Sequence, residues 1–255
     1  MSAPWKAAIP VPSPTEPDLL SMTSEAHAVL RSYLSLIDLA AATSPRSKQI
    51  PIGASEIGWD CDRRLAYRLA GTAPVNYGDP MKLIVGIGVH LWLAERFRAL
   101  DGGSGRFLVE YDCLYGDVPG HGDLYDRHNH VALDWKTTSR SRIKEMARRG
   151  EPSRQYVTQI NHNALGLKAM GEQPKAVALI FLARDGGLDD SWAWMSRLDP
   201  SFVDSAVERL RQIESVGHID PAAVSCTPGK DCGFCRNYNP TSTNLSLSCD
   251  ARKGR

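Results

Sequence analysis

The apolar residues of the chain recur with two different spacings, which predict an alternation of helices and strands. Helical spacing, with glycine or proline at several of the ends, predicts five helices at residues 18–42, 55–69, 82–100, 153–170 and 200–216. Alternating or unbroken apolar runs predict five strands at residues 106–115, 118–125, 131–137, 175–183 and 191–197. This order of elements is typical of an α/β fold with a mixed sheet flanked by helices.

The composition changes along the chain and suggests four parts. Residues 1–17 contain five prolines and few apolar anchors, which predicts a disordered arm. Residues 18–50 are expected to form a helical extension and linker, residues 51–240 the core, and residues 241–255 a flexible tail. Ser55 is expected to cap the helix that runs through Cys61.

The bulk composition is that of a soluble globular protein. The chain has 255 residues, 42% of them hydrophobic, and a net charge of +1, so any nucleic-acid contact must come from a local basic region. The start lacks the pattern of a signal peptide, and no apolar run is long enough to span a membrane. We therefore expect a cytoplasmic protein without disulfides.

The segment from Gly120 to Ser139 places charges within a half-buried hairpin. Asp134 and Lys136 are two residues apart on a strand and share a face, while Leu133 and Trp135 face the other side. Asp123 lies on the neighbouring strand. Two carboxylates on adjacent strands are close enough to bind one Mg²⁺ or Mn²⁺ ion, and a lysine beside them can orient or deprotonate a water molecule. The alternative is an exposed sheet face with an ordinary Asp–Lys pair.

The order of these motifs resembles the RecB-type branch of the PD-(D/E)XK nucleases. GxxD ends at Asp123, D-x-K follows at Asp134, and an upstream G-V-H ends at His90 with Glu95 after it. The resemblance implies a restriction-endonuclease-like core, with the metal held by His90, Asp123, Asp134 and the Trp135 carbonyl.

The same resemblance assigns the remaining catalytic roles. Lys136 would assist the attacking water, and Gln159 would position substrate or nucleophile as the first residue of Q-x-x-x-Y. Asn163 stands where that motif has tyrosine, which weakens the role of Gln159. His121 competes with His90 as a ligand or contacts DNA, but the family pattern has no histidine at its position.

Four of the six cysteines form a soft-metal pattern. Cys226, Cys232 and Cys235 lie close together in the sequence, and Cys61 opens CDRRLAY far upstream. This one-plus-three arrangement resembles the iron–sulfur nucleases, including the CRISPR-associated exonucleases, where such cysteines hold a [4Fe–4S] cluster. The alternatives are Zn²⁺ in the same sulfurs or free thiols. Cys113 and Cys249 are interpreted as a buried small residue and a free thiol.

Basic residues follow the D-x-K strand directly and are candidates for binding the phosphate backbone. The DNA-binding candidates are Arg63, Arg140, Arg142, Lys144, Arg148 and Arg149. The alternative for this segment is a solvated loop and helix surface, and for Arg63 a salt bridge.

The predicted function is a metal-dependent deoxyribonuclease, in a bacterial or phage-infected cell. The family implies exonuclease action on DNA ends, most often single-stranded, in recombination, repair, phage replication or CRISPR-type complexes with protein partners. Two alternatives stay open: a non-catalytic nucleic-acid-binding protein with the same fold, and a structural zinc protein whose D-x-K is accidental. Strand polarity, oligomeric state and the choice between DNA and RNA are left open by the sequence.

Overall fold

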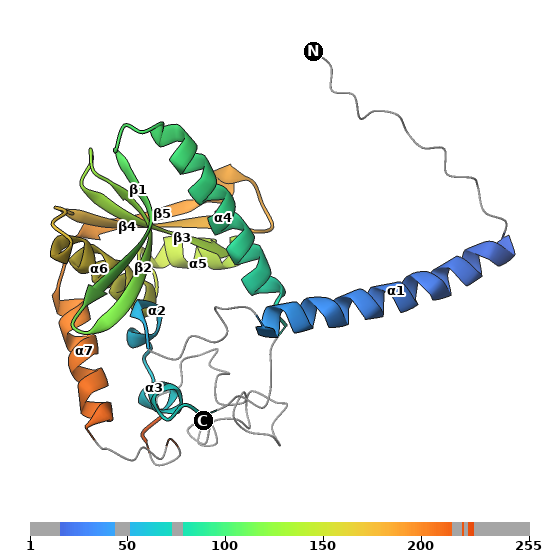
Figure 1. The fold of residues 1–255 in the computed structure, drawn as a ribbon, viewed down its shortest axis with the longest axis horizontal. Helices are drawn as coiled ribbons and strands as arrows, with labels where there is room; N and C mark the ends of the chain where they lie inside the picture. Colours follow the sequence, from blue (N-terminus) through green and yellow to red (C-terminus); the bar gives the residue numbers. More distant parts are fainter. Residues whose placement is uncertain (1–15, 44–51, 73–78, 216–220, 222–223, 227–255) are drawn as a thin grey trace. The chain divides into compact units, whose positions relative to one another are not determined.

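The computed structural model describes residues 16–43, 52–72, 79–215, 221 and 224–226 (Figure 1). The chain divides into two units, residues 1–48 and residues 49–255. The first unit contains α1 (Glu16–Thr43), which confirms the helix predicted at 18–42. Glu16 and Pro17, which were predicted to belong to the disordered arm, are instead the first residues of α1. The rest of the predicted arm, most of the linker, the tail, Cys232, Cys235 and Cys249 lie outside the described residues.

A five-stranded mixed sheet forms the centre of the second unit. Its strands lie in chain order, and they are β1 (Phe107–Tyr115), β2 (Val118–Asp126), β3 (Val131–Thr138), β4 (Ala176–Ala183) and β5 (Trp192–Arg197). Only β3 and β4 pair in parallel, whereas the other neighbours are antiparallel. A parallel pair needs a crossover connection, which α5 (Arg140–Arg149) and α6 (Arg154–Ala169) supply.

Helices lie on both faces of this sheet (Figure 1). The contacts of two neighbouring side chains of β3 agree with this. Trp135 packs on Phe97 of α4 (Met81–Asp101), with ring centroids 5.5 Å apart. Lys136, the next residue, bonds to Gln159 of α6. Successive residues of a strand point to opposite faces, so α4 and α6 lie on opposite sides of the sheet. The predicted α/β fold is confirmed.

Two apolar clusters hold these layers together. One lies between the sheet and the helices α5 and α6, with Tyr125, Ile160 and Phe181 among its fully buried members. The other joins α2 (Ala54–Ile57), α3 (Asp62–Leu69) and α7 (Ser201–Glu214) to the turn end of β2 through Val118. The second cluster anchors the segment that carries Cys61.

The helix predicted from Ser55 to residue 69 is wrong as one element. It is two helices, α2 and α3, and Gly53 rather than Ser55 occupies the N-cap of the first. Gly58 ends α2 because the chain passes very close to α6: a Cβ there would lie 2.8 Å from the Gln155 Cα. The apolar pattern predicts no helix at residues 140–149, where α5 forms with Ile143 and Met146 buried.

Candidate metal centre

Asp134 and Lys136 of β3 form a buried ion pair facing α6. Lys136 Nζ lies 2.5 Å from Asp134 Oδ2, and the two side chains are 16% and 1% exposed. The predicted sharing of one strand face is therefore confirmed. An exposed hairpin face, the alternative in the sequence analysis, does not describe this pair, because both charges are removed from bulk water.

Gln159 of α6 connects the two charged groups. Lys136 donates a hydrogen bond to Gln159 Oε1 at 3.0 Å, and Gln159 Nε2 donates to Asp134 Oδ1 at 3.3 Å. The Lys136 ammonium also lies 5.0 Å from the centre of the Tyr156 ring. Asp134, Gln159 and Tyr156 therefore all lie near the ammonium, and their contacts restrict the otherwise flexible lysine side chain.

Burial and the ion pair itself have opposite effects on the pKa values of Asp134 and Lys136. Burial raises the pKa of Asp134 to about 6, with Lys136 opposing the rise and Asp123 adding to it. Burial alone lowers the pKa of Lys136, but the carboxylates of Asp134 and Asp123 outweigh it, so the pKa is raised overall. At neutral pH Asp134 is mainly ionised and Lys136 is a cation.

Asp123 of β2 connects the D-x-K strand to helix α4. Its Oδ2 accepts a hydrogen bond from the backbone N–H of Trp135 at 2.7 Å, and its Oδ1 lies 3.2 Å from Nδ1 of His90. The hydrogen bond to Asp123 raises the pKa of His90, with burial opposing it. The three elements β2, β3 and α4 therefore meet at one carboxylate.

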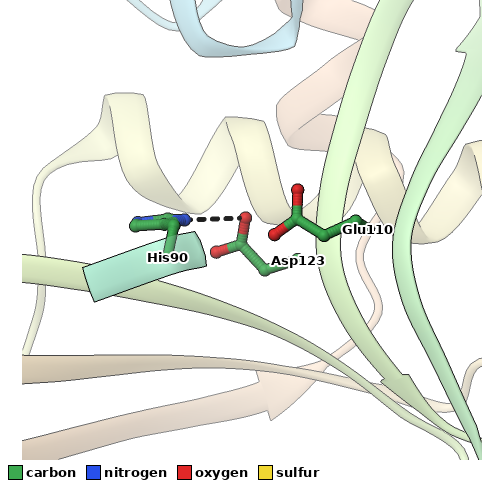
Figure 2. Close-up of side chains that lie close together, drawn as sticks. All are labelled: His90, Glu110 and Asp123. Carbon is green, nitrogen blue, oxygen red and sulfur yellow. Dashed lines mark hydrogen bonds and ion pairs between the residues drawn. The ribbon is translucent and has the colours of Figure 1, made fainter. Parts of the chain in front are cut away.

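Glu110 of β1 belongs to this site and was missed by the sequence analysis. Ligand atoms of His90, Glu110 and Asp123 all lie within 4.8 Å of one another, and Figure 2 shows the Glu110 carboxylate turned toward Asp123. The register of the β1–β2 hairpin indicates that Glu110 lies near Asp123. Tyr115 pairs with Val118 across the two-residue turn, and counting back along both strands places position 110 opposite position 123.

His121 lies next to Glu110 rather than at the centre of the site. Its Nε2 is 2.5 Å from Glu110 Oε2, and its Nδ1 is 2.8 Å from Asp112 Oδ1. The hydrogen bond to Glu110 and a second one to Asp112 raise the pKa of His121 to about 9, against the effect of burial. Both imidazole nitrogens are thus engaged by carboxylates, which accords with ranking His90 above it as a ligand.

The residues at this site fit a hard divalent cation. Carboxylate oxygens of Glu110 and Asp123 and one nitrogen of His90 are donors that Mg²⁺ and Mn²⁺ accept, and they lie within 4.8 Å of one another. Asp134 is not part of this close group. Its buried Oδ2 is ion-paired with Lys136, and a carboxylate has further acceptor positions with which it can bind an ion. The predicted use of the Trp135 carbonyl stays a prediction, since the contact that Trp135 makes to Asp123 is through its N–H.

Asn163 connects helix α6 to strand β2 in the core. It is fully buried on α6, and its Nδ2 donates to the His121 carbonyl of β2 at 2.9 Å. A Cβ on Gly120 would lie 2.7 Å from the Asn163 Oδ1, so helix and strand are in close contact there. The residue at the position of the motif tyrosine therefore supports the strand that carries Asp123.

The cysteines that the structure describes divide as the sequence analysis divided them. Cys61, at the N-cap of α3, is buried with its sulfur 3.7 Å from that of Cys226. A disulfide would need about 2.05 Å, so these are two adjacent thiols. Cys113 is buried in the core, where burial raises its pKa to about 11. Its interpretation as a buried small residue is confirmed.

The candidate DNA-binding residues separate into two groups. Arg63 donates to the Val224 carbonyl at 2.9 Å, and its backbone N–H donates to Ser225, so it braces the segment before Cys226. The others occupy the exposed face of α5, namely Arg140, Arg142, Lys144, Arg148 and Arg149. This helix begins two residues after β3 ends, so its basic face starts close to Lys136 in the chain.

Comparisons with known proteins give structural neighbours only. No protein-family model and no curated protein matches the sequence. An alkaline exonuclease from Laribacter hongkongensis is 11% identical, with a TM-score of 0.47 over 67% of this chain and 89% of its own. A protein named SSO0001 is 15% identical, with a TM-score of 0.42 over 72% and 87%. A phage-related exonuclease from Haemophilus somnus is 11% identical, with a TM-score of 0.37 over 59% and 75%.

Proposed function

We propose that this chain is a metal-dependent deoxyribonuclease that hydrolyses phosphodiester bonds. The single observation that carries the proposal is the buried arrangement of Asp134, Lys136 and Gln159 beside the Asp123–His90 pair. Hard-metal ligands, a fixed ammonium and a fixed amide are the groups that phosphodiester hydrolysis uses.

Stability alone is a poor explanation for these charges. Moving an ion pair out of water costs several kcal/mol per ion, by the order of magnitude of measured cases, and apolar residues of similar volume are often as stable. Here Asp134, Lys136 and Asp123 are all largely buried at one place between the sheet and its helices. Such concentration of buried charge favours a catalytic site over a structural one.

His90, Asp123 and Asp134 are the side chains that would hold the ion. When bound, a divalent cation polarises the phosphate and lowers the pKa of a coordinated water. Lys136, held by Asp134 and Gln159, would offset charge on the phosphate and orient or deprotonate the attacking water. Gln159 fixes the direction of that ammonium.

The substrate is proposed to be DNA, approached at an end and mainly as a single strand. The exposed basic face of α5 follows the catalytic strand and provides several cations for the phosphate backbone. Their contribution would be sequence-independent and sensitive to salt. Exonuclease action and protein partners in recombination or CRISPR-type complexes rest on the motif resemblance.

We also propose a metal cluster at the cysteines. The adjacency of Cys61 and Cys226, with Arg63 bracing the residues before Cys226, supports a soft-metal site completed by Cys232 and Cys235. Anaerobic purification tests it: iron, sulfide and absorbance near 400 nm are expected. A colourless protein containing one zinc ion would establish the zinc alternative, and absence of both metals would reject a cluster.

The function is tested with anaerobically purified full-length chain on end-labelled single- and double-stranded DNA with Mn²⁺ or Mg²⁺. Asp134→Asn and Lys136→Met are expected to abolish cleavage, whereas Asp126→Asn should retain it. Asp126 is a matched control because it is a buried carboxylate of the same strand as Asp123, but it pairs with Arg106. Equal cleavage by all three variants contradicts the proposal, and metal-independent DNA binding without cleavage indicates the binding protein instead.

A further inference from the structure

The backbone of β1 is distorted at Glu110. This residue has φ of +52°, in the left-handed region that a non-glycine residue rarely occupies within a strand. Leu108 and Tyr111 pack in the same core cluster although they are three residues apart, so the alternation of side chains breaks between them. The cost of such a residue is about 1 kcal/mol or more, which requires compensation from its surroundings.

The distortion lies directly opposite the metal-centre carboxylate. The pairs Val109–Leu124 and Tyr111–Gly122 bracket positions 110 and 123 in the register. The close approach at this point also requires Gly122, where a Cβ would lie 2.1 Å from the Tyr111 ring. Glu110 and Asp123 are therefore opposite each other in the register, at the point where the backbone of β1 departs from regular strand geometry.

The two carboxylates are adjacent, and each also contacts a histidine. His121 Nε2 lies 2.5 Å from Glu110 Oε2, and His90 Nδ1 lies 3.2 Å from Asp123 Oδ1. Figure 2 shows His90, Asp123 and Glu110 side by side. Two carboxylates with oxygens within 4.8 Å repel each other unless a cation lies near. An ion held by both carboxylates and His90 would relieve this repulsion.

We propose that Glu110 is a further ligand of the divalent ion, acting from β1 together with His90 and Asp123, and that His121 positions it. This inference rests on the proposed nuclease function but adds a residue that none of the sequence motifs contains. Its ligand atom is within 4.8 Å of those of His90 and Asp123, as a shared ion requires. Asp134, the remaining carboxylate that the motifs assign to the ion, is ion-paired with Lys136.

The test measures Mn²⁺ binding to the full-length chain without DNA, by calorimetry and by the electron paramagnetic resonance signal of the free ion. Glu110→Gln keeps the side-chain length and a bond to His121 but removes the negative charge. Its Mn²⁺ affinity is expected to fall at least about 10-fold, in line with other changes near bound metals. Glu110→Asp is expected to retain part of the affinity, because it keeps a carboxylate on the same strand position.

Asp117→Asn is the control. Asp117 follows the same strand, its side chain is 94% exposed and it pairs with Arg211, so its loss should leave Mn²⁺ affinity unchanged. Wild-type affinity in Glu110→Gln, with affinity lost in Asp123→Asn, would overturn the role of Glu110 and leave the proposed function intact. Unchanged affinity in Asp123→Asn as well would reject the metal centre itself. A thermal unfolding measurement in chelator verifies that each variant is folded.

Discussion

Lys136 donates a hydrogen bond to Gln159 across 3.0 Å, which connects the central strand β3 to helix α6 within the buried part of the site. The same glutamine donates to Asp134, so one neutral side chain sets the orientation of both charged groups. This relationship gives Gln159 a defined role despite the asparagine at position 163. A positioning role of this kind is separable from a structural one by mutation.

Replacing Gln159 by leucine is expected to reduce DNA cleavage by roughly 100-fold, because small displacements of a catalytic group carry penalties of that order. The free energy of unfolding should also fall, by about 3 kcal/mol, because both lost hydrogen bonds are to charged groups. Gln155→Leu, one turn earlier on α6, removes a bond to the Ser55 carbonyl instead and should leave cleavage unchanged. Equal cleavage by both variants would limit Gln159 to packing.

Removing one member of the Asp134–Lys136 pair should destabilise the fold more than removing both. Lys136→Met leaves a buried carboxylate without its cation, which costs about 3 kcal/mol. The Asp134→Asn/Lys136→Met double variant should recover much of this loss, as chemical unfolding in a double-mutant cycle will measure. The same cycle on Arg127 and Glu172, a more exposed pair, should show coupling of about 1 kcal/mol or less. Similar coupling energies in the two pairs would show that burial does not determine the strength of the Asp134–Lys136 interaction.

Acid should weaken the fold through Asp126. Hydrogen bonds from the Arg106 guanidinium lower the pKa of Asp126 to about 2, with burial opposing them, from an ordinary value of 3.8. A lowered folded-state pKa means that the stabilisation is fully present above about pH 4 and is lost as the pH falls toward 2. Asp126→Asn should therefore flatten the pH dependence of unfolding between those values. It should also lower stability at neutral pH by about 1 kcal/mol, since the guanidinium is half exposed.

The control for that titration is Asp117→Asn. Asp117 lies in the turn between β1 and β2, its side chain is 94% exposed, and asparagine tolerates its positive φ. Its pH profile should follow the wild type. A wild-type acid slope in Asp126→Asn would instead assign the acid sensitivity to other carboxylates.

Restoring the motif tyrosine at position 163 should not improve catalysis. Asn163 is fully buried and bonds to the His121 carbonyl, so Asn163→Tyr inserts a larger ring into a packed core and removes that bond. A loss of about 2 kcal/mol in the free energy of unfolding is expected. Asn163→Ala should also lose stability, without overpacking. Faster cleavage by the tyrosine variant would show that the site retains the geometry of the motif.

The local elements could be predicted because each has a sequence pattern of its own. The helices at 82–100 and 153–170 and all five strands have repeating apolar positions, and the structure confirms each within one or two residues. Asp134 and Lys136 share a face for the same reason, since a strand alternates its side chains. The helix α5 was missed because its two buried residues stand among many charges. The break at Gly58 was missed because it depends on contact with α6.

The sequence by itself determined the class of fold, the D-x-K strand and the pairing of charge types that suits a hard metal. Only the tertiary structure decided which groups meet: Asp123 with His90, Lys136 with Gln159, and Cys61 with Cys226. The register of the hairpin places Glu110 opposite Asp123, but the left-handed backbone at Glu110 has no local signal in the sequence. Side-chain periodicity is a local property of the chain, whereas distances between charges depend on the register of the sheet and on the helices packed against it.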